Sequence, residues 1–168
     1  SRFIHLPPCG AFQTKGSTIM STIAVVGLGN PGEQYIGTRH NAGFWMLDNL
    51  VSRNDGSWKN RRRFHSMTSL INSWPRPTLL VKPMTCVNDS GAYLKPLIKY
   101  HDCLAKEVIV VHDDTAFPIG QIKISEEKGD GGHNGIKNIM RAIGPNFIRF
   151  RLGIGKKPVN KSMSSYVL

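Results

Sequence analysis

Short runs of apolar, often β-branched residues are spread along the chain, separated by polar or glycine-containing segments. Runs of this kind are typical of buried strands. The clearest are VIVV at residues 108–111 and TIAVV at residues 22–26. Weaker runs predict further strands at residues 67–74, 78–81, 122–124 and 150–154.

Between these runs, apolar residues recur at the three- and four-residue spacing of a helix face. Residues 41–53 predict a helix that Asn41 caps, and residues 134–143 predict one that ends at Gly144. A third helix is expected over residues 90–100, with a kink at Pro96. Because strands alternate with helices, we expect an α/β fold. The prediction is a single-domain three-layer α/β/α sandwich around a mixed, mostly parallel, twisted sheet.

Charge is the feature of the composition that changes this picture most. Across 168 residues, 22 Lys and Arg face 11 Asp and Glu, a formal net charge of +11. Such an excess favours a polyanionic partner such as nucleic acid. No apolar run approaches the roughly 18 residues of a membrane span, and three cysteines without metal-ligand spacing suit a reducing compartment. We therefore expect a cytoplasmic protein with no membrane contact.

Two further segments have simple alternative interpretations. Residues 1–19 fit no structural pattern and are expected to be a disordered leader or appended tail ahead of a domain at residues 20–168. If they are a native leader, an organellar location would replace the cytoplasmic one. The basic run WKNRRRF at residues 58–64 is either an ordinary solvated surface or a contact for nucleic acid.

The segment GLGNPGEQYIGTRHNAGF at residues 27–44 begins with glycines in the G-x-G-x-x-G spacing of dinucleotide-binding turns. In such a turn the helix follows the last glycine directly, so that its N-terminus holds the pyrophosphate. Here Pro31 lies within the turn, and a polar stretch separates Gly32 from the predicted helix. The pattern therefore argues against NAD binding and indicates a loop that carries side chains.

Polar side chains follow or precede several of the predicted elements. They include Asn30, Tyr35 and His40 in the first loop, Asn88, the run His112, Asp113 and Asp114 after a strand, and His133 and Asn134 before the last helix. Ligands bind outside the carboxyl ends of parallel strands, so a site is expected there. Histidine with a carboxylate and carboxamides suits activation of water. The alternative is a metal site from His40, His112, His133 and Asp113, which lack the helical spacing of zinc motifs.

Five segments resemble the bacterial-type peptidyl-tRNA hydrolase family in sequence, order and spacing. They are GLGNPGEQYIGTRHNAGF, VKPMTCVNDSG, VHDDTAFPIGQ, GDGGHNGIKNI and FIRFRLGIGKKP, and the resemblance spans about residues 23–168. It implies a mixed sheet flanked by helices. It also implies hydrolysis of the ester between a peptide and the 3′ ribose of tRNA, which recycles tRNA from stalled translation. The expected partner is peptidyl-tRNA; the expected enzyme is a monomer that uses neither cofactor nor metal.

The resemblance also implies a role for individual residues. His40 would be the base that activates water, Asp113 its partner, and Asn30 a catalytic residue that holds the peptide main chain. Residues expected to bind substrate are Tyr35, Asn88, His133, Asn134 and Arg151. Tyr35 would pack on the terminal nucleotide or peptide, and Arg151 would contact a phosphate.

Some positions depart from the family's pattern. Cys86 and Val87 stand where a bulky aromatic residue and a methionine are usual, which predicts a smaller pocket wall. The family's C-terminal helical segment would lie beyond Leu168, so the domain is expected to lack it. A catalytically inactive relative that binds RNA or protein, like a splicing factor, is the alternative function.

Overall fold

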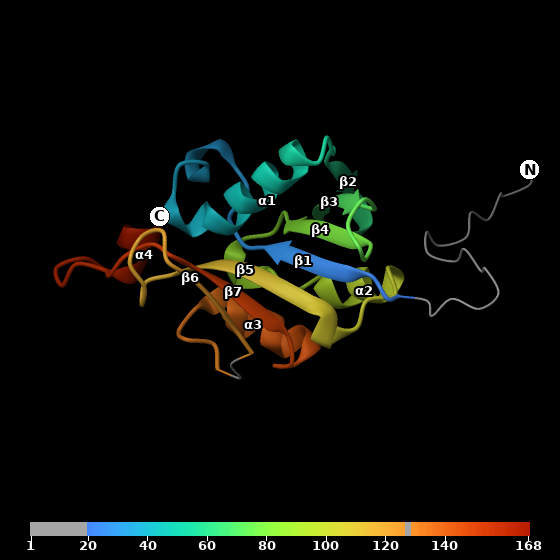
Figure 1. The fold of residues 1–168 in the computed structure, drawn as a ribbon. Helices are drawn as coiled ribbons and strands as arrows, with labels where there is room; N and C mark the ends of the chain where they lie inside the picture. The colour runs from blue at the N-terminus through green and yellow to red at the C-terminus, as the bar shows by residue number, and fades with distance from the viewer. Residues whose placement is uncertain (1–19, 127–128) are drawn as a thin grey trace, which may run out of the picture.

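The computed structural model describes residues 20–126 and 129–168, so the expected leader at residues 1–19 lies outside the described part. A seven-stranded sheet crosses these residues in the order β2-β3-β4-β1-β5-β7-β6 (Figure 1). The central pairings β4–β1, β1–β5 and β5–β7 are parallel, and the outer ones are antiparallel. The strands are β1 (Ile23–Gly27), β2 (Lys59–Arg61), β3 (Ser66–Ile71), β4 (Thr78–Pro83), β5 (Val108–Asp114), β6 (Ile122–Ser125) and β7 (Ile148–Gly153).

Helices cover both faces of the sheet, which confirms the expected three-layer sandwich (Figure 1). Helix α1 (Ala42–Arg53) packs Leu47 and Val51 on one face. Helices α2 (Leu94–Tyr100) and α3 (Asn134–Ile143) pack on the other, and the short α4 (Met163–Val167) follows β7. Single-turn 3-10 helices are η1 (Glu33–Tyr35), η2 (Arg39–Asn41), η3 (Arg62–Phe64), η4 (Val87–Asp89) and η5 (Ala105–Glu107). In the described residues, no helix has the length and apolarity needed to cross a membrane.

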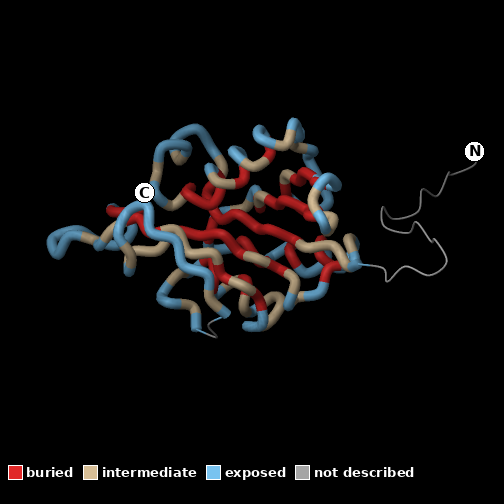
Figure 2. Tube along the Cα trace, viewed as in Figure 1, coloured by how far each residue is buried: buried red, intermediate tan, exposed pale blue. Residues whose placement is uncertain are grey.

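The core lies where the sequence predicts it, along the central strands. Buried positions follow β1, β4 and β5, and the exposed positions lie at the outer edges and loops (Figure 2). Because these strands are covered on both faces, they carry nearly continuous apolar runs rather than an alternating pattern. A site at their carboxyl ends is therefore built on the most deeply buried part of the fold.

Two predicted elements differ from the observed ones in ways that matter. The helix expected over residues 90–100 begins only at Leu94, so Pro96 lies in its first turn. Backbone N–H groups there have no acceptor within the helix, and proline is tolerated without the predicted kink. Strand β5 continues past the apolar run to Asp114, which places His112 and Asp113 on the strand itself.

Close packing, rather than a phosphate, requires glycine at Gly29 in the first loop and at Gly43 in α1. A Cβ atom on Gly43 would lie 2.5 Å from both the amide nitrogen of Leu28 and the carbonyl oxygen of Val111. A Cβ on Gly29 would lie 2.8 Å from the ring of Phe44. Two 3-10 turns, η1 and η2, separate Gly32 from α1. The loop therefore brings α1 directly against the end of β1 and carries side chains, as the sequence predicts.

Candidate active site

A cavity of about 530 Å³ opens where β1, β4 and β5 end. All the site residues predicted from the sequence line it except Tyr35: Asn30, His40, Asn88, Asp113, His133, Asn134 and Arg151. Tyr35 lies half-buried in η1 and is absent from the cavity wall. Cys86 and Val87, the two positions that depart from the family's pattern, are part of the wall. The position of the cavity is the one expected for a sheet with parallel central strands.

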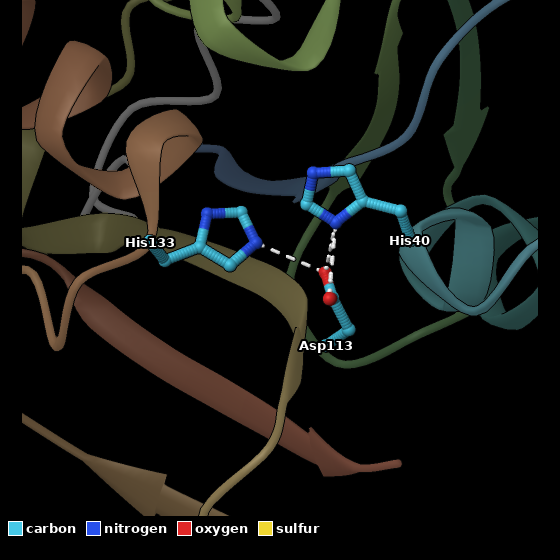
Figure 3. Close-up of side chains that lie close together, drawn as sticks. All are labelled: His40, Asp113 and His133. Carbon is cyan, nitrogen blue, oxygen red and sulfur yellow. Dashed lines mark hydrogen bonds and ion pairs between the residues drawn. The ribbon is translucent and has the colours of Figure 1, made fainter. Parts of the chain in front are cut away.

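At the centre of the cavity, two histidines share one carboxylate (Figure 3). Nδ1 of His40 lies 2.9 Å and 3.0 Å from the two carboxylate oxygens of Asp113. Nε2 of His133 lies 2.9 Å from Oδ1 of the same residue. These residues come from η2, β5 and the start of α3, so three separate segments of the chain meet at Asp113.

The hydrogen bonds determine which ring nitrogens carry protons. Nδ1 of His133 accepts from the backbone N–H groups of Gly135 and Ile136, at 3.1 Å and 3.4 Å, and thereby caps α3. Its proton is therefore on Nε2, which donates to Asp113. The ionised carboxylate of Asp113 can only accept hydrogen bonds, so Nδ1 of His40 likewise carries a proton and donates it to Asp113. The lone pair of His40 is then on Nε2, which points away from Asp113 (Figure 3).

Asp113 is buried, yet its surroundings keep it ionised. Burial acts to raise the pKa of this carboxyl group, but hydrogen bonds from His133 and His40 outweigh burial and hold the pKa well below its usual range. An ionised carboxylate in this position orients both imidazoles. Such a carboxylate can also stabilise a positive charge on His40.

His112 belongs to the polar run that the sequence places at the site, where the metal alternative gave it its only specific role. It precedes Asp113 on β5, is buried, and its Nδ1 donates to the carbonyl oxygen of Asp113 at 2.8 Å. Its ring meets that of His133 edge-on, with centroids 4.9 Å apart. Burial, followed by the proximity of His133, lowers the pKa of His112 to about 3. His112 is therefore an uncharged imidazole that packs beside His133 in the cavity wall.

We expect His112 to make the protein less stable in acid. An unfolded histidine titrates near pH ~6.5, whereas folded His112 stays neutral until its pKa of about 3. The stability that neutral His112 contributes is thus complete above pH ~6.5 and is lost as the pH falls toward the folded pKa. The loss between about pH 7 and about pH 4.5 should be roughly 2 kcal/mol.

Urea unfolding of the parent and of His112→Asn at these two pH values measures this contribution. The variant should be less stable at about pH 7, because it leaves space in a packed site, but it should lose less stability on acidification. Equal losses in both proteins would contradict the assignment.

Asn41 occupies the predicted N-cap position of α1, but its side chain does not cap the helix. Its carboxamide instead holds the backbone of Asn30, accepting from the N–H at 2.8 Å and donating to the carbonyl oxygen at 3.0 Å. Oδ1 of Asn30 accepts from the N–H of Val87 at 2.8 Å. This leaves the NH₂ group as the polar group that Asn30 can offer to the cavity.

The remaining predicted residues of the cavity wall differ in how exposed they are and in what they contact. Asn88 on η4 and Asn134 at the start of α3 are exposed. Nε of Arg151 donates to Oδ2 of Asp114 at 2.7 Å, and its guanidinium lies 4.8 Å from the ring centroid of Phe117. Arg151 is therefore fixed at the edge of the cavity.

The alternative of a metal site can be tested against this geometry. One ligand atom each from His40, Asp113 and His133 lie within 4.8 Å of one another. A metal at Nε2 of His133 would require the proton on Nδ1, which would then face two backbone N–H donors. The hydrogen bonds of His133 therefore disfavour a metal ion bound through its Nε2.

Comparisons with known proteins give a consistent result. The sequence profile of the family described as peptidyl-tRNA hydrolase matches residues 24–168. Peptidyl-tRNA hydrolase of Alkalilimnicola ehrlichii is 40% identical over 146 residues, 86% of this chain and 74% of the relative. That of Acinetobacter baumannii strain AYE is 39% identical over 150 residues, 89% and 78% of the two chains. The crystal structure of peptidyl-tRNA hydrolase from Acinetobacter baumannii superposes with a TM-score of 0.83 at 37% identity, covering 90% of this chain and 78% of that one.

Proposed function

The chain belongs to the peptidyl-tRNA hydrolase family, and on this premise we propose that His40 activates the water that attacks the ester of peptidyl-tRNA. The reaction is hydrolysis of the bond between the peptide and the tRNA, and the chain is an ester hydrolase. The observation that supports the role of His40 most directly is its bond to Asp113 through Nδ1, beside a cavity. That bond leaves Nε2 with the lone pair that a general base needs.

The proposed reaction has two steps, and its protons balance. Water gives a proton to Nε2 of His40 as its oxygen attacks the ester carbonyl, and Asp113 stabilises the imidazolium. The tetrahedral intermediate then collapses, the bond to the ribose 3′ oxygen breaks, and His40 returns the proton to that oxygen. The products are a peptide with a free carboxyl group and a tRNA with a free 3′ hydroxyl.

Carboxamides around the cavity would hold the substrate during these steps. The NH₂ group of Asn30 and the side chain of Asn88 are proposed to bind the peptide main chain, and Asn134 the 3′ end of the tRNA. Donors placed where negative charge develops lower the barrier of acyl transfer. Asn30, whose side-chain oxygen already accepts from the N–H of Val87, is the best fixed of the three.

His133 is proposed to act mainly through Asp113. Both of its nitrogens are engaged within the protein, one by the backbone of α3 and one by the carboxylate. Its role would be to fix Asp113, so that His40 is held in the correct tautomer. Arg151 is proposed to contact a phosphate at the edge of the cavity, and Tyr35 to contact substrate outside it.

We infer that the enzyme works without a metal or cofactor, as a cytoplasmic monomer. The hydrogen bonds of His133 support the first part of this proposal, because they disfavour a metal at its Nε2. An inactive RNA- or protein-binding relative is the less favoured function. The close pairing of His40 with Asp113 is the feature such a protein would not need.

Release of the peptide from an N-blocked aminoacyl-tRNA tests the proposal. The full chain should catalyse release, and a chelator of divalent cations should leave kcat unchanged when the Mg²⁺ needed by the tRNA is kept in excess. Absence of release, with tRNA binding intact, would favour the inactive relative. A loss of kcat that only a transition metal restores would contradict the hydrogen-bonded cluster.

A further inference from the structure

We propose that a surface beside the cavity, formed by β2, η3 and the start of α2, binds the RNA of the substrate. We call it the β2–η3 surface, and its residues are Lys59, Arg61, Arg62, Arg63, His65 and Tyr93. None of these residues lines the cavity described above. The inference rests on the proposed function, because it assigns this surface to the same substrate.

The pairing of the strands places this surface at the end of the sheet that carries the cavity. Ser66, the first residue of β3, is opposite Pro83, the last residue of β4. The turn that joins η3 to β3 therefore lies at the carboxyl end of β4, from which the chain continues into η4 and Asn88. His65 and Tyr93 line a small hollow together with Thr85, just before η4. The surface thus borders the wall of the cavity that carries Asn88.

The register also shows that the cations of β2 face α2. Lys59 is opposite Thr68, and Thr68 is opposite Val81, which packs in the core beneath α2 and α3. Because opposed residues point to the same face, Lys59 lies on that face, as does Arg61 two positions later. The cations of β2 therefore lie on the face of the sheet that α2 covers, and η3 itself is in contact with α2.

The positive charge of this surface is not neutralised by acidic neighbours. In residues 20–126 and 129–168, no ion pair joins a carboxylate to Lys59, Arg61, Arg62 or Arg63. All four are exposed. By contrast, Arg76 and Arg151 do form ion pairs. They are partly buried against Glu107 and Asp114, respectively. Exposed, unneutralised cations are the groups that displace counterions from a nucleic acid.

Aromatic rings are exposed beside these cations. The rings of His65 and Tyr93 stack with centroids 4.3 Å apart and an interplanar angle of 25°. The left-handed conformation of His65, with φ of 42°, presents its ring there, and its carbonyl oxygen accepts from the N–H of Met84 at 2.7 Å. Stacked rings beside arginines are typical of surfaces that hold unpaired bases and phosphates.

Protection of an edge strand explains only part of this pattern. β2 is an edge strand, and lysine or arginine on an edge discourages pairing with other chains. That explanation covers Lys59 and Arg61. It does not cover Arg62 and Arg63, which lie on η3, or the exposed stack of His65 and Tyr93. RNA accounts for both features, since its phosphates would pair with the cations and its bases would stack on the exposed rings.

The test compares two double variants of the full chain. Arg62→Gln with Arg63→Gln removes two cations of the surface, and Arg53→Gln with Lys106→Gln removes two exposed cations elsewhere. Binding to deacylated tRNA is measured as a function of salt, and peptide release is measured with an N-blocked aminoacyl-tRNA and with an N-blocked aminoacyl ester of adenosine. The adenosine ester has no phosphates, so it reports the chemistry of the cavity alone.

The Arg62/Arg63 variant should bind tRNA about tenfold more weakly, with a salt slope smaller by about 1.5. Its KM for the tRNA substrate should rise by a similar factor, with kcat and the rate on the adenosine ester unchanged. Tyr93→Leu should also raise KM, and Tyr93→Phe should restore it. Slopes equal to those of the control variant would overturn the inference. Failure of the parent to release peptide would instead overturn the proposed function, and tRNA binding would still test the surface.

Discussion

Replacing His40 with alanine is expected to lower kcat for peptide release by about a thousandfold, since general bases typically contribute factors of 10²–10⁴. The fold should survive the change. Asp113 keeps its hydrogen bond from His133, so no buried carboxylate is left without a donor. The free energy of unfolding should therefore change by no more than about 1 kcal/mol. Affinity for tRNA should stay the same, because the role proposed for His40 is to bind the reacting water and not the nucleic acid.

The comparison needs a second histidine variant. His101→Ala removes a half-buried histidine at the end of α2, outside the cavity, and should keep the kcat of the parent. Peptide release by His40→Ala at the rate of His101→Ala would show that another group activates the water. Because loss of structure would also lower kcat, thermal unfolding is measured on each sample to show that the variants are folded.

Asp113→Asn should produce the second largest loss, about 10²–10⁴-fold in kcat. The substitution keeps the size of the side chain but removes its charge and turns one acceptor into a donor. An NH₂ group beside Nδ1 of His40 favours the tautomer with its proton on Nε2, which can no longer accept a proton from water. The imidazolium would also lose its counter-charge.

Two measurements separate this effect from a general loss of structure. The KM for the tRNA substrate should stay within about twofold, because Asp113 is buried and the residues proposed to contact the RNA lie elsewhere. Nitrogen NMR of the imidazole rings should show the proton of His40 moving from Nδ1 to Nε2. An unchanged tautomer together with full activity would exclude Asp113 as the partner of His40. Asp114→Asn, which alters the neighbouring carboxylate paired with Arg151, should affect kcat far less.

Much of the fold follows from local pattern. The apolar runs of β1, β4 and β5 and the helical spacing of α1 and α3 are strong signals, because both faces of the central sheet are covered. The ends were harder to predict, since they depend on tertiary contacts. Polar residues extend β5 to Asp114, where they pair with β7. The short α4 has one local signal, Ser162, whose hydroxyl accepts from the N–H of Ser165.

The site was predictable as a set of residues and less so as a geometry. The sequence pattern and the family resemblance name His40, Asp113 and Asn30, and the structure brings them to one cavity. The two bonds from Asn41 to Asn30 could not be inferred, because a residue before a helix is read as its cap. The sharing of Asp113 by two histidines could not be inferred either, because His40 and His133 are 93 residues apart in the chain.

The close contact at Gly43 divides the cavity into a fixed wall and an adaptable one. Helix α1 is in backbone contact with the end of β1 and with β5, so it cannot slide, and His40 immediately before it cannot move by such a shift. Adjustment to peptides of different bulk therefore falls to other parts of the wall, above all the glycine-rich segment at residues 129–132. The cavity can in this way vary its fit without moving His40.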